Sequence, residues 1–89
     1  MQTIGIYPNP KKTETIPVLH KTVQYLLANG INVLIPEENA IFAGLPEFAA
    51  LREKMKNSIS LALTLGGDGT LLNIAKEMAP LGIPICGIN

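Results

Sequence analysis

Five consecutive residues, Gly66-Gly67-Asp68-Gly69-Thr70, carry the clearest chemical signal in the sequence. They follow an apolar segment, residues 60–65, and precede a segment with helical spacing. Glycines leave the backbone bare, so that its N–H groups can approach a phosphate or a ribose closely. The N-terminal end of a following helix favours anions. Asp68 is then a carboxylate suited to orient or deprotonate a hydroxyl, to accept hydrogen bonds from a ribose, or to act on a metal ion through water.

A purely structural interpretation of these five residues is a tight turn between a strand and a helix, with Asp68 or Thr70 as the helix cap. Glycine and aspartate are favoured in turns for conformational reasons alone. Two common nucleotide-binding fingerprints, G-x-G-x-x-G and G-x-x-x-x-G-K-[ST], are absent from the sequence. Their absence excludes an ordinary dinucleotide-dependent dehydrogenase domain and a P-loop ATPase.

The hydrophobic pattern predicts elements that would place this loop at one edge of a parallel sheet. We expect strands at residues 3–7, 31–35, 60–65 and 83–88, and helices at residues 16–28, 48–55 and 71–78. Thr15 is a candidate cap for the first helix, and residues 36–47 are expected to form a loop or a short helical turn. The order βαβ-(α)-βαβ indicates an α/β fold with an open parallel Rossmann-like sheet, in which ligands bind at the carboxyl ends of the strands.

Length and composition limit the possible classes of protein. The 89 residues are 47 % hydrophobic and 16 % charged, with a formal net charge of +0, which indicates a globular chain of one domain at most. A zero net charge argues against broad electrostatic binding to nucleic acid or to an anionic membrane. There is no signal peptide and no apolar run of about 20 residues, so we expect a cytoplasmic protein.

Isolated residues add less. The single cysteine excludes an internal disulfide and a metal site made of cysteines alone, and the single histidine has no metal-ligand spacing around it, so no zinc site is predicted. We expect His20 on the surface, Cys86 as a small buried hydrophobe, and Tyr7 and Tyr25 in or beside the core. Only Asn89 follows the last predicted strand, so nothing caps the sheet or lines the crevice above it, and we expect an incomplete domain that is part of a larger protein.

Several segments resemble a superfamily that contains NAD kinases, diacylglycerol and sphingosine lipid kinases, and 6-phosphofructokinases. GGDGT after an apolar strand is the signature of that superfamily. The opening IGIYPNPKK, residues 4–12, and the tail GIPICGIN, residues 82–89, are similar to the NAD kinase members in particular. Lipid kinases tend to carry a strand leading to Pro-x-Gly-Thr in place of that tail. The resemblance is strongest over residues 61–89.

The resemblance implies that ATP, with Mg²⁺, phosphorylates the 2′-hydroxyl of the adenosine ribose of NAD to give NADP. It implies that Asp68 is the catalytic proton acceptor and contacts the NAD ribose. The ligands are then small-molecule nucleotides, and the full-length protein is expected to be a homo-oligomer. The cofactor-binding residues expected from the resemblance are Gly66, Gly67, Asp68, Gly69, Thr70, Asn73 and Asn89.

Two departures from the family pattern bear on these expectations. Asn73 stands where many members place a basic residue near the substrate phosphates. The family's glycine-rich stretch after GIN, its Asn-Glu dipeptide and its carboxy-terminal β-rich domain are absent from these 89 residues. We therefore interpret residues 1–89 as the amino-terminal α/β nucleotide-binding domain of a larger kinase.

Two alternatives stay open at this point. The first is a lipid kinase domain of the same superfamily. The second is a non-catalytic nucleotide-binding module that uses the amides of the GGDGT loop only to hold a phosphate. Lys11 and Lys12, which follow the first predicted strand, could contact ATP phosphates or be solvated surface charges.

Overall fold

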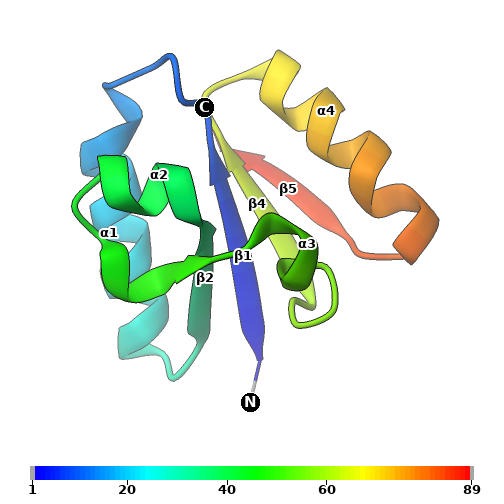
Figure 1. Ribbon diagram of the computed structural model, residues 1–89, viewed down its shortest axis with the longest axis horizontal. Coiled ribbons are helices and arrows are strands. Elements are labelled where there is room, and N and C mark those ends of the chain that lie inside the picture. Colours follow the sequence, from blue (N-terminus) through cyan, green and yellow to red (C-terminus); the bar gives the residue numbers. More distant parts are fainter. Residues whose placement is uncertain (1, 89) are drawn as a thin grey trace.

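The computed structural model describes residues 2–88 as a five-stranded sheet with helices on both faces (Figure 1). All strand pairs are parallel, and the strand order is β3-β2-β1-β4-β5. The strands are β1 (Thr3–Pro8), β2 (Asn32–Pro36), β3 (Ala49–Ala50), β4 (Leu61–Leu65) and β5 (Ile85–Ile88). This arrangement confirms the predicted open, parallel, Rossmann-like α/β fold.

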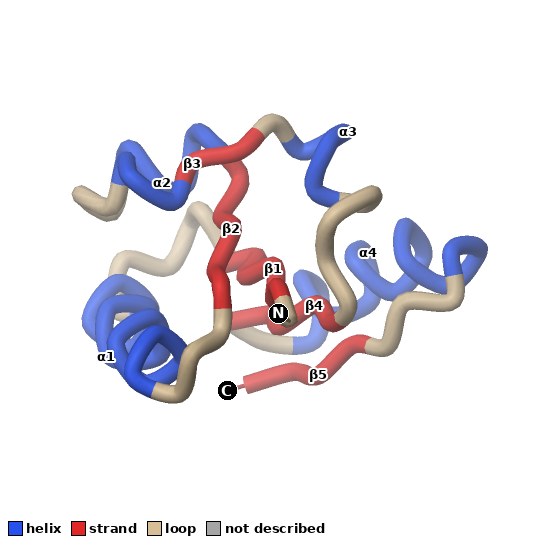
Figure 2. The backbone as a smooth tube through the Cα atoms, turned by 90° about the horizontal axis from the view of Figure 1, so that it is seen from below, coloured by secondary structure: helices blue, strands red, loops and turns tan. Residues whose placement is uncertain are grey.

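Four α-helices connect the strands and divide between the two faces. They are α1 (Thr15–Ala28), α2 (Glu37–Phe42), α3 (Arg52–Met55) and α4 (Asp68–Met78), with short 3₁₀ turns η1 (Pro46–Phe48) and η2 (Ala79–Leu81). Figure 2 shows α1 on one side of the sheet and α4 on the other. The β1-α1-β2 and β4-α4-β5 connections therefore cross opposite faces, as in doubly wound sheets.

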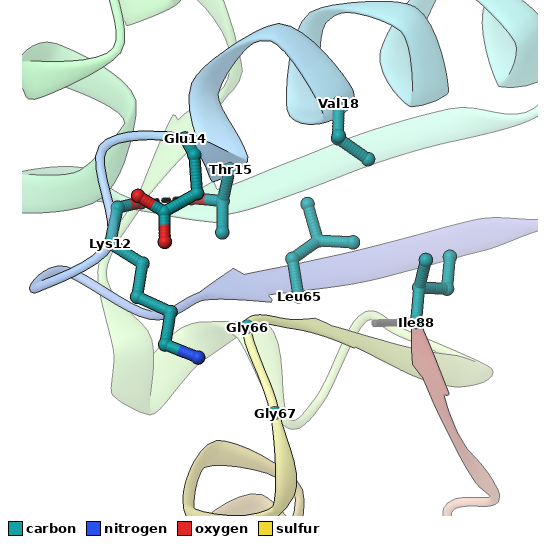
Figure 3. A pocket seen from close by; sticks show the side chains of 8 residues that line it. All are labelled: Lys12, Glu14, Thr15, Val18, Leu65, Gly66, Gly67 and Ile88. Atoms are coloured by element: carbon teal, nitrogen blue, oxygen red, sulfur yellow. Dashed lines mark hydrogen bonds between the residues drawn. The ribbon is translucent and has the colours of Figure 1, made fainter.

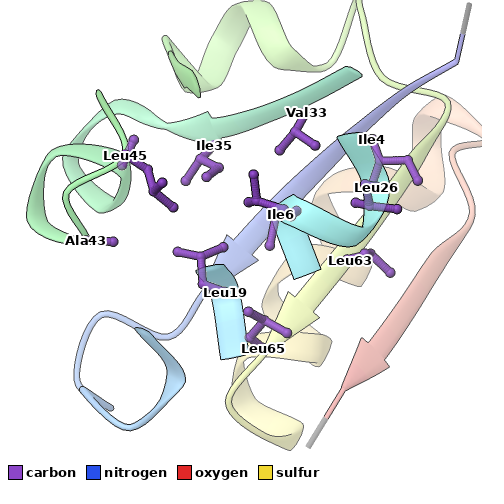
Figure 4. Close-up of a cluster of buried hydrophobic side chains, with 12 residues drawn as sticks. Ile4, Ile6, Leu19, Leu26, Val33, Ile35, Ala43, Leu45, Leu63 and Leu65 are labelled. Atoms are coloured by element: carbon purple, nitrogen blue, oxygen red, sulfur yellow. The ribbon is translucent and has the colours of Figure 1, made fainter. Parts of the chain in front are cut away.

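Each face of the sheet has its own hydrophobic core. On the first face, β1 and β4 contribute Ile6 and Leu65, and α1 contributes Leu19 (Figure 4). On the second face, Tyr7 and Ile74 pack with residues of α3, α4 and β4. Strands β1 and β4 are buried on both faces, because each of them lies between two layers of helix. These two strands form the rigid centre that carries the site.

The structure corrects part of the prediction for residues 36–56. Residues 37–42 form the short helix α2, which is one of the two forms expected for residues 36–47. The predicted helix 48–55 is wrong over its first half. Residues 46–48 form the 3₁₀ turn η1, and Ala49–Ala50 pairs with Ile35 and Pro36 as a fifth strand. Only the last turn of the predicted helix, α3, is helical. The pairing with β2 is a long-range contact that local periodicity does not contain.

Helix boundaries also differ from the prediction. α1 begins at Thr15 with Glu14 at the N-cap position, and no side chain caps it. The Thr15 hydroxyl instead donates a hydrogen bond to the Lys12 carbonyl oxygen at 2.7 Å. α4 begins at Asp68, three residues before the predicted start.

Burial confirms Tyr7 as a core residue and corrects two other expectations. Tyr25 is 69 % exposed, because Val23 and Leu26 turn their side of α1 towards the sheet and Tyr25 lies on the other side. Cys86 is exposed, because β5 is an edge strand that is covered much less than β1 and β4. His20 is part-buried rather than fully exposed on the surface, and its Nε2 lies 2.8 Å from the Ala43 carbonyl oxygen. Within residues 2–88, no helix is long and apolar enough to cross a membrane.

Candidate functional site

The strand order creates a topological switch point between β1 and β4. The chain proceeds from β1 through β2 to β3 in one direction, then returns to place β4 against the other side of β1. The loops that follow β1 and β4 therefore lead to helices on opposite faces of the sheet. Ligands of open α/β sheets bind in the crevice that such a divergence leaves at the carboxyl ends of the strands.

These two loops are in direct contact. The backbone N–H of Asn9 donates a hydrogen bond to the Leu65 carbonyl oxygen at 2.8 Å. Gly66 has a φ of 118°, and a Cβ on it would lie 2.5 Å from the Asn9 Cβ. Gly67 also has a positive φ, of 112°. Glycine is thus required at these positions both by the backbone conformation and, at Gly66, by the close approach of the other loop.

Asp68 is the first residue of α4 and is exposed. Gly67 occupies the N-cap position of α4, and no side chain makes a capping hydrogen bond there. The interpretation of GGDGT as a simple turn, with Asp68 or Thr70 as the helix cap, is therefore wrong about the cap. A negative charge in the first turn of a helix interacts favourably with the positive end of the helix dipole. Asp68 is therefore a solvent-accessible carboxylate at the helix end that faces the switch point.

One pocket lies on the α1 side of the loop and has a volume of about 360 Å³. Its lining includes Gly66 and Gly67 together with Lys12, Val18 and Ile88 (Figure 3). Figure 3 shows the Lys12 side chain extending towards Gly67, and Lys12 Nζ is 3.5 Å from the point that a Gly67 Cβ would occupy. This α1-side pocket combines an apolar wall, a bare backbone, the Lys12 ammonium group and the Glu14 carboxylate.

A second pocket, of about 370 Å³, lies on the α4 side of the loop. Among the residues that line it are Gly69, Thr70 and Asn73 of α4, Lys11 of the β1 loop, and Arg52 of α3. Lys11 and Lys12 are adjacent in sequence but line different pockets, one on each side of the GGDGT loop. This α4-side pocket is the more basic of the two.

The predicted site residues thus divide into two sets around Asp68. Gly66 and Gly67 line the α1-side pocket, whereas Gly69, Thr70 and Asn73 line the α4-side pocket. Asn89 lies outside the described residues.

Sequence reasoning missed Arg52 and Tyr7, which both line the α4-side pocket. The sequence contained no signal for Arg52, which lies in a segment whose fold was predicted wrongly. Tyr7 was assigned to the core, which is correct, but it also lines this pocket. Burial and the nearby Glu77 carboxylate raise the pKa of Tyr7 to about 12, with the Arg52 charge acting in the opposite direction. The phenol therefore stays protonated at neutral pH.

A doubly wound parallel sheet with a glycine-rich loop and two pockets at its switch point defines a nucleotide-binding α/β domain. The sequence matches the family model for the ATP-NAD kinase N-terminal domain over residues 4–89. The chain belongs to the NAD kinase family.

Curated relatives agree with this assignment. The chain is 35 % identical to an NAD kinase of Desulforamulus reducens, with 100 % of the chain and 31 % of the relative aligned. It is 39 % identical to an NAD kinase of Moorella thermoacetica, with 100 % of the chain and 28 % of the relative aligned. An NAD kinase of Nitrosospira multiformis is 35 % identical, with 99 % of the chain and 30 % of the relative aligned. The chain therefore spans less than a third of the length of these relatives.

Proposed function

We propose that the protein containing this chain transfers the γ-phosphoryl group of ATP to the 2′-hydroxyl of the adenosine ribose of NAD, which gives NADP and ADP. Family membership supports phosphorylation of NAD in general. The observation that supports the transfer from ATP to the ribose hydroxyl is the position of Asp68. In the sequence it stands between Gly67, which lines one pocket, and Gly69, which lines another pocket of similar volume. Two nucleotides must meet at one reacting centre in this reaction, and two adjacent pockets meet that requirement. We further propose that residues 1–89 form the amino-terminal domain of the larger kinase.

In the proposed reaction Asp68 orients the ribose hydroxyl and accepts its proton. The hydroxyl oxygen forms a bond to the γ-phosphorus of ATP, and the bond between that phosphorus and the β,γ-bridging oxygen breaks, so that ADP leaves with the electron pair. Phosphoryl transfer depends mainly on positioning and charge stabilisation, and the side chains of Lys11 and Lys12 and the amides of Gly67 and Gly69 are placed to supply both.

In the proposed reaction a Mg²⁺ ion would be held by Asp68 together with nucleotide phosphates and water. Among residues 2–88 no three His, Cys, Asp or Glu side chains converge. Mg²⁺ usually binds through one or two carboxylates together with substrate phosphates and water, so Asp68 alone is a sufficient protein contact. When bound, the ion would neutralise charge on the phosphates. The proposed ligands are thus ATP, NAD and Mg²⁺.

The proposal is tested by incubating the full-length protein with ATP, MgCl₂ and NAD, and measuring NADP with an NADP-specific dehydrogenase. The expected result is NADP formation that requires all three additions. Hydrolysis of ATP without NADP formation would contradict the proposal. Binding of NAD and ATP without any turnover would favour the non-catalytic module.

We expect the 89-residue chain by itself to form no detectable NADP. Asp68 is exposed and both pockets are open at the edge of the sheet, so these residues cannot exclude water from two bound nucleotides. The measurement is the same coupled assay on the purified chain, with an Asp68→Ala variant prepared in parallel to reveal a contaminating host kinase. Activity of the chain that disappears in the variant would show that the expectation is wrong.

A further inference from the structure

A cluster of three side chains beneath the α4-side pocket has no role in the reaction described above. Tyr7 comes from β1, Arg52 from α3 and Glu77 from α4. The Arg52 guanidinium carbon lies 5.2 Å from the centre of the Tyr7 ring, which is a cation–π contact. Arg52 Nη2 lies 3.4 Å from Glu77 Oε1. The guanidinium group is therefore held between an aromatic face and a carboxylate at the edge of the pocket.

The contacts that hold Arg52 are weak. A donor–acceptor distance of 3.4 Å is longer than that of a well-formed charge-assisted hydrogen bond. The Arg52 side chain is 50 % exposed, and exposed ion pairs contribute little to stability. Arg52 can therefore leave Glu77 at small cost and use its donors elsewhere.

Two buried polar atoms of this cluster have no hydrogen-bond partner among the described residues. They are the hydroxyl oxygen of Tyr7 and Oε2 of Glu77. Tyr7 is 2 % exposed and lines the α4-side pocket. A buried hydroxyl without a partner is costly, and a ligand that accepts a hydrogen bond from it would remove that cost. A phenol is protonated at neutral pH, so the missing partner of the Tyr7 hydroxyl can be an acceptor, such as a phosphate oxygen.

The charges around the pocket indicate the sign of the ligand. Lys11 and Arg52 line it, and no carboxylate is among the residues that do so. Gly69 and Thr70, in the first turn of α4, bring the positive end of the helix to the same wall. The one acidic group at the cluster, Glu77, is paired with Arg52 and lies 3.9 Å from the Lys56 ammonium group.

We propose that Arg52 and Tyr7 form a binding subsite for the phosphate chain of a nucleotide in the α4-side pocket. Arg52 turns from Glu77 to the phosphates when the ligand enters, and this movement uncovers the Tyr7 hydroxyl, which donates a hydrogen bond to a phosphate oxygen. The subsite deepens the proposed function, because either nucleotide of that reaction carries such a chain: the triphosphate of ATP or the diphosphate of NAD.

The test measures dissociation constants of the full-length protein for inorganic tripolyphosphate, ATP and NAD by calorimetry at fixed ionic strength. Arg52→Met keeps a long, unbranched side chain and removes the donors, and it should weaken tripolyphosphate binding about tenfold or more, as expected for a lost charge-assisted hydrogen bond. Lys54→Met is the matched control, because Lys54 is an exposed cation of the same helix that does not line the pocket. It should change the dissociation constant by less than about twofold.

Two further variants separate a binding role from a structural one. Tyr7→Phe should weaken tripolyphosphate binding about fivefold to tenfold, while the melting temperature stays unchanged or rises, because the variant removes a buried unpartnered hydroxyl. A hydroxyl that only supported the fold would lower the melting temperature when removed. Glu77→Gln removes the competing carboxylate and should strengthen binding about twofold to threefold. These variants also keep the test decisive if Arg52→Met fails to fold.

The three ligands identify the source of the phosphates. A loss of affinity for ATP alone in Arg52→Met and Tyr7→Phe would place the phosphoryl donor in this pocket, and a loss for NAD alone would place the acceptor there. Unchanged affinity for all three ligands, or a loss equal to that of Lys54→Met, would overturn the subsite. Absence of NADP formation, with ATP or NAD binding that still depends on Arg52, would contradict the proposed function and leave the subsite intact.

Discussion

Replacing Asp68 with asparagine is expected to lower kcat for NAD phosphorylation by about 10²–10⁴ in the full-length enzyme, the usual range for a positioned acid–base group. Asparagine has the same shape but cannot accept the proton of the ribose hydroxyl. The dissociation constant for NAD should change much less, because the amide oxygen can still accept a hydrogen bond from the ribose. The measurement is the pair of kcat and NAD Kd for wild type and variant.

The structure makes this substitution a clean test of catalysis. Asp68 makes no capping hydrogen bond and is exposed, so its replacement removes only a favourable charge from the first turn of α4. That loss should lower the free energy of unfolding by less than about 1 kcal/mol. Glu47→Gln, which neutralises an exposed carboxylate away from both pockets, is the control and should leave kcat unchanged. A kcat for Asp68→Asn within about threefold of wild type, well below the tenfold that 1.36 kcal/mol represents, would remove Asp68 from the mechanism.

The second large effect is expected at Gly66, where alanine should lower the free energy of unfolding by about 2–4 kcal/mol. The φ of 118° is a conformation that residues with a side chain rarely adopt, and forcing it costs about 1–3 kcal/mol. The added Cβ would also lie 2.5 Å from the Asn9 Cβ, so one of the two loops must move. Urea denaturation followed by circular dichroism measures the change.

Two other glycines separate the causes of this effect. Gly30 has a positive φ of 74° with no atom within 4 Å of its Cβ position, so Gly30→Ala measures conformational strain without a clash. Gly69 lies inside α4 with no atom within 4 Å of its Cβ position, and Gly69→Ala should leave stability unchanged or raise it by about 0.5–1 kcal/mol. If Gly66→Ala costs no more than Gly30→Ala, the contact between the two loops does not constrain the site.

The sequence by itself determined the central elements of the fold and the family. Strands β1, β2, β4 and β5 and helices α1 and α4 lie close to their predicted positions, because each carries its own hydrophobic period or a continuous apolar run. The GGDGT loop was recognisable because its glycines and its aspartate are adjacent in the chain. Family membership followed from that loop and the segments at residues 4–12 and 82–89, and the family comparison confirms it. The catalytic role of Asp68 stays a prediction.

The tertiary structure alone decided which residues surround that loop. The sheet places β4 directly beside β1, although the two strands are far apart in the chain.

 Gly5 and Ala62 are partners in the register of β1 and β4, although their numbers differ by 57 (62 − 5). The spacing of apolar residues depends only on the conformation of one element, so it predicts each strand but not the order of the strands in the sheet. That order creates the switch point and brings the β1 loop, with Lys11 and Lys12, to the GGDGT loop.

The same physical reason explains the residues that sequence reasoning missed or misplaced. Arg52 reaches the α4-side pocket because Ala49–Ala50 pairs with β2 and positions the start of α3 above the Tyr7 ring. Cys86 is exposed because β5 lies at the edge of the sheet, although its own sequence is as apolar as that of a buried strand. In both cases the environment of a side chain is set by segments far away in the chain, and only the assembled sheet brings those segments together.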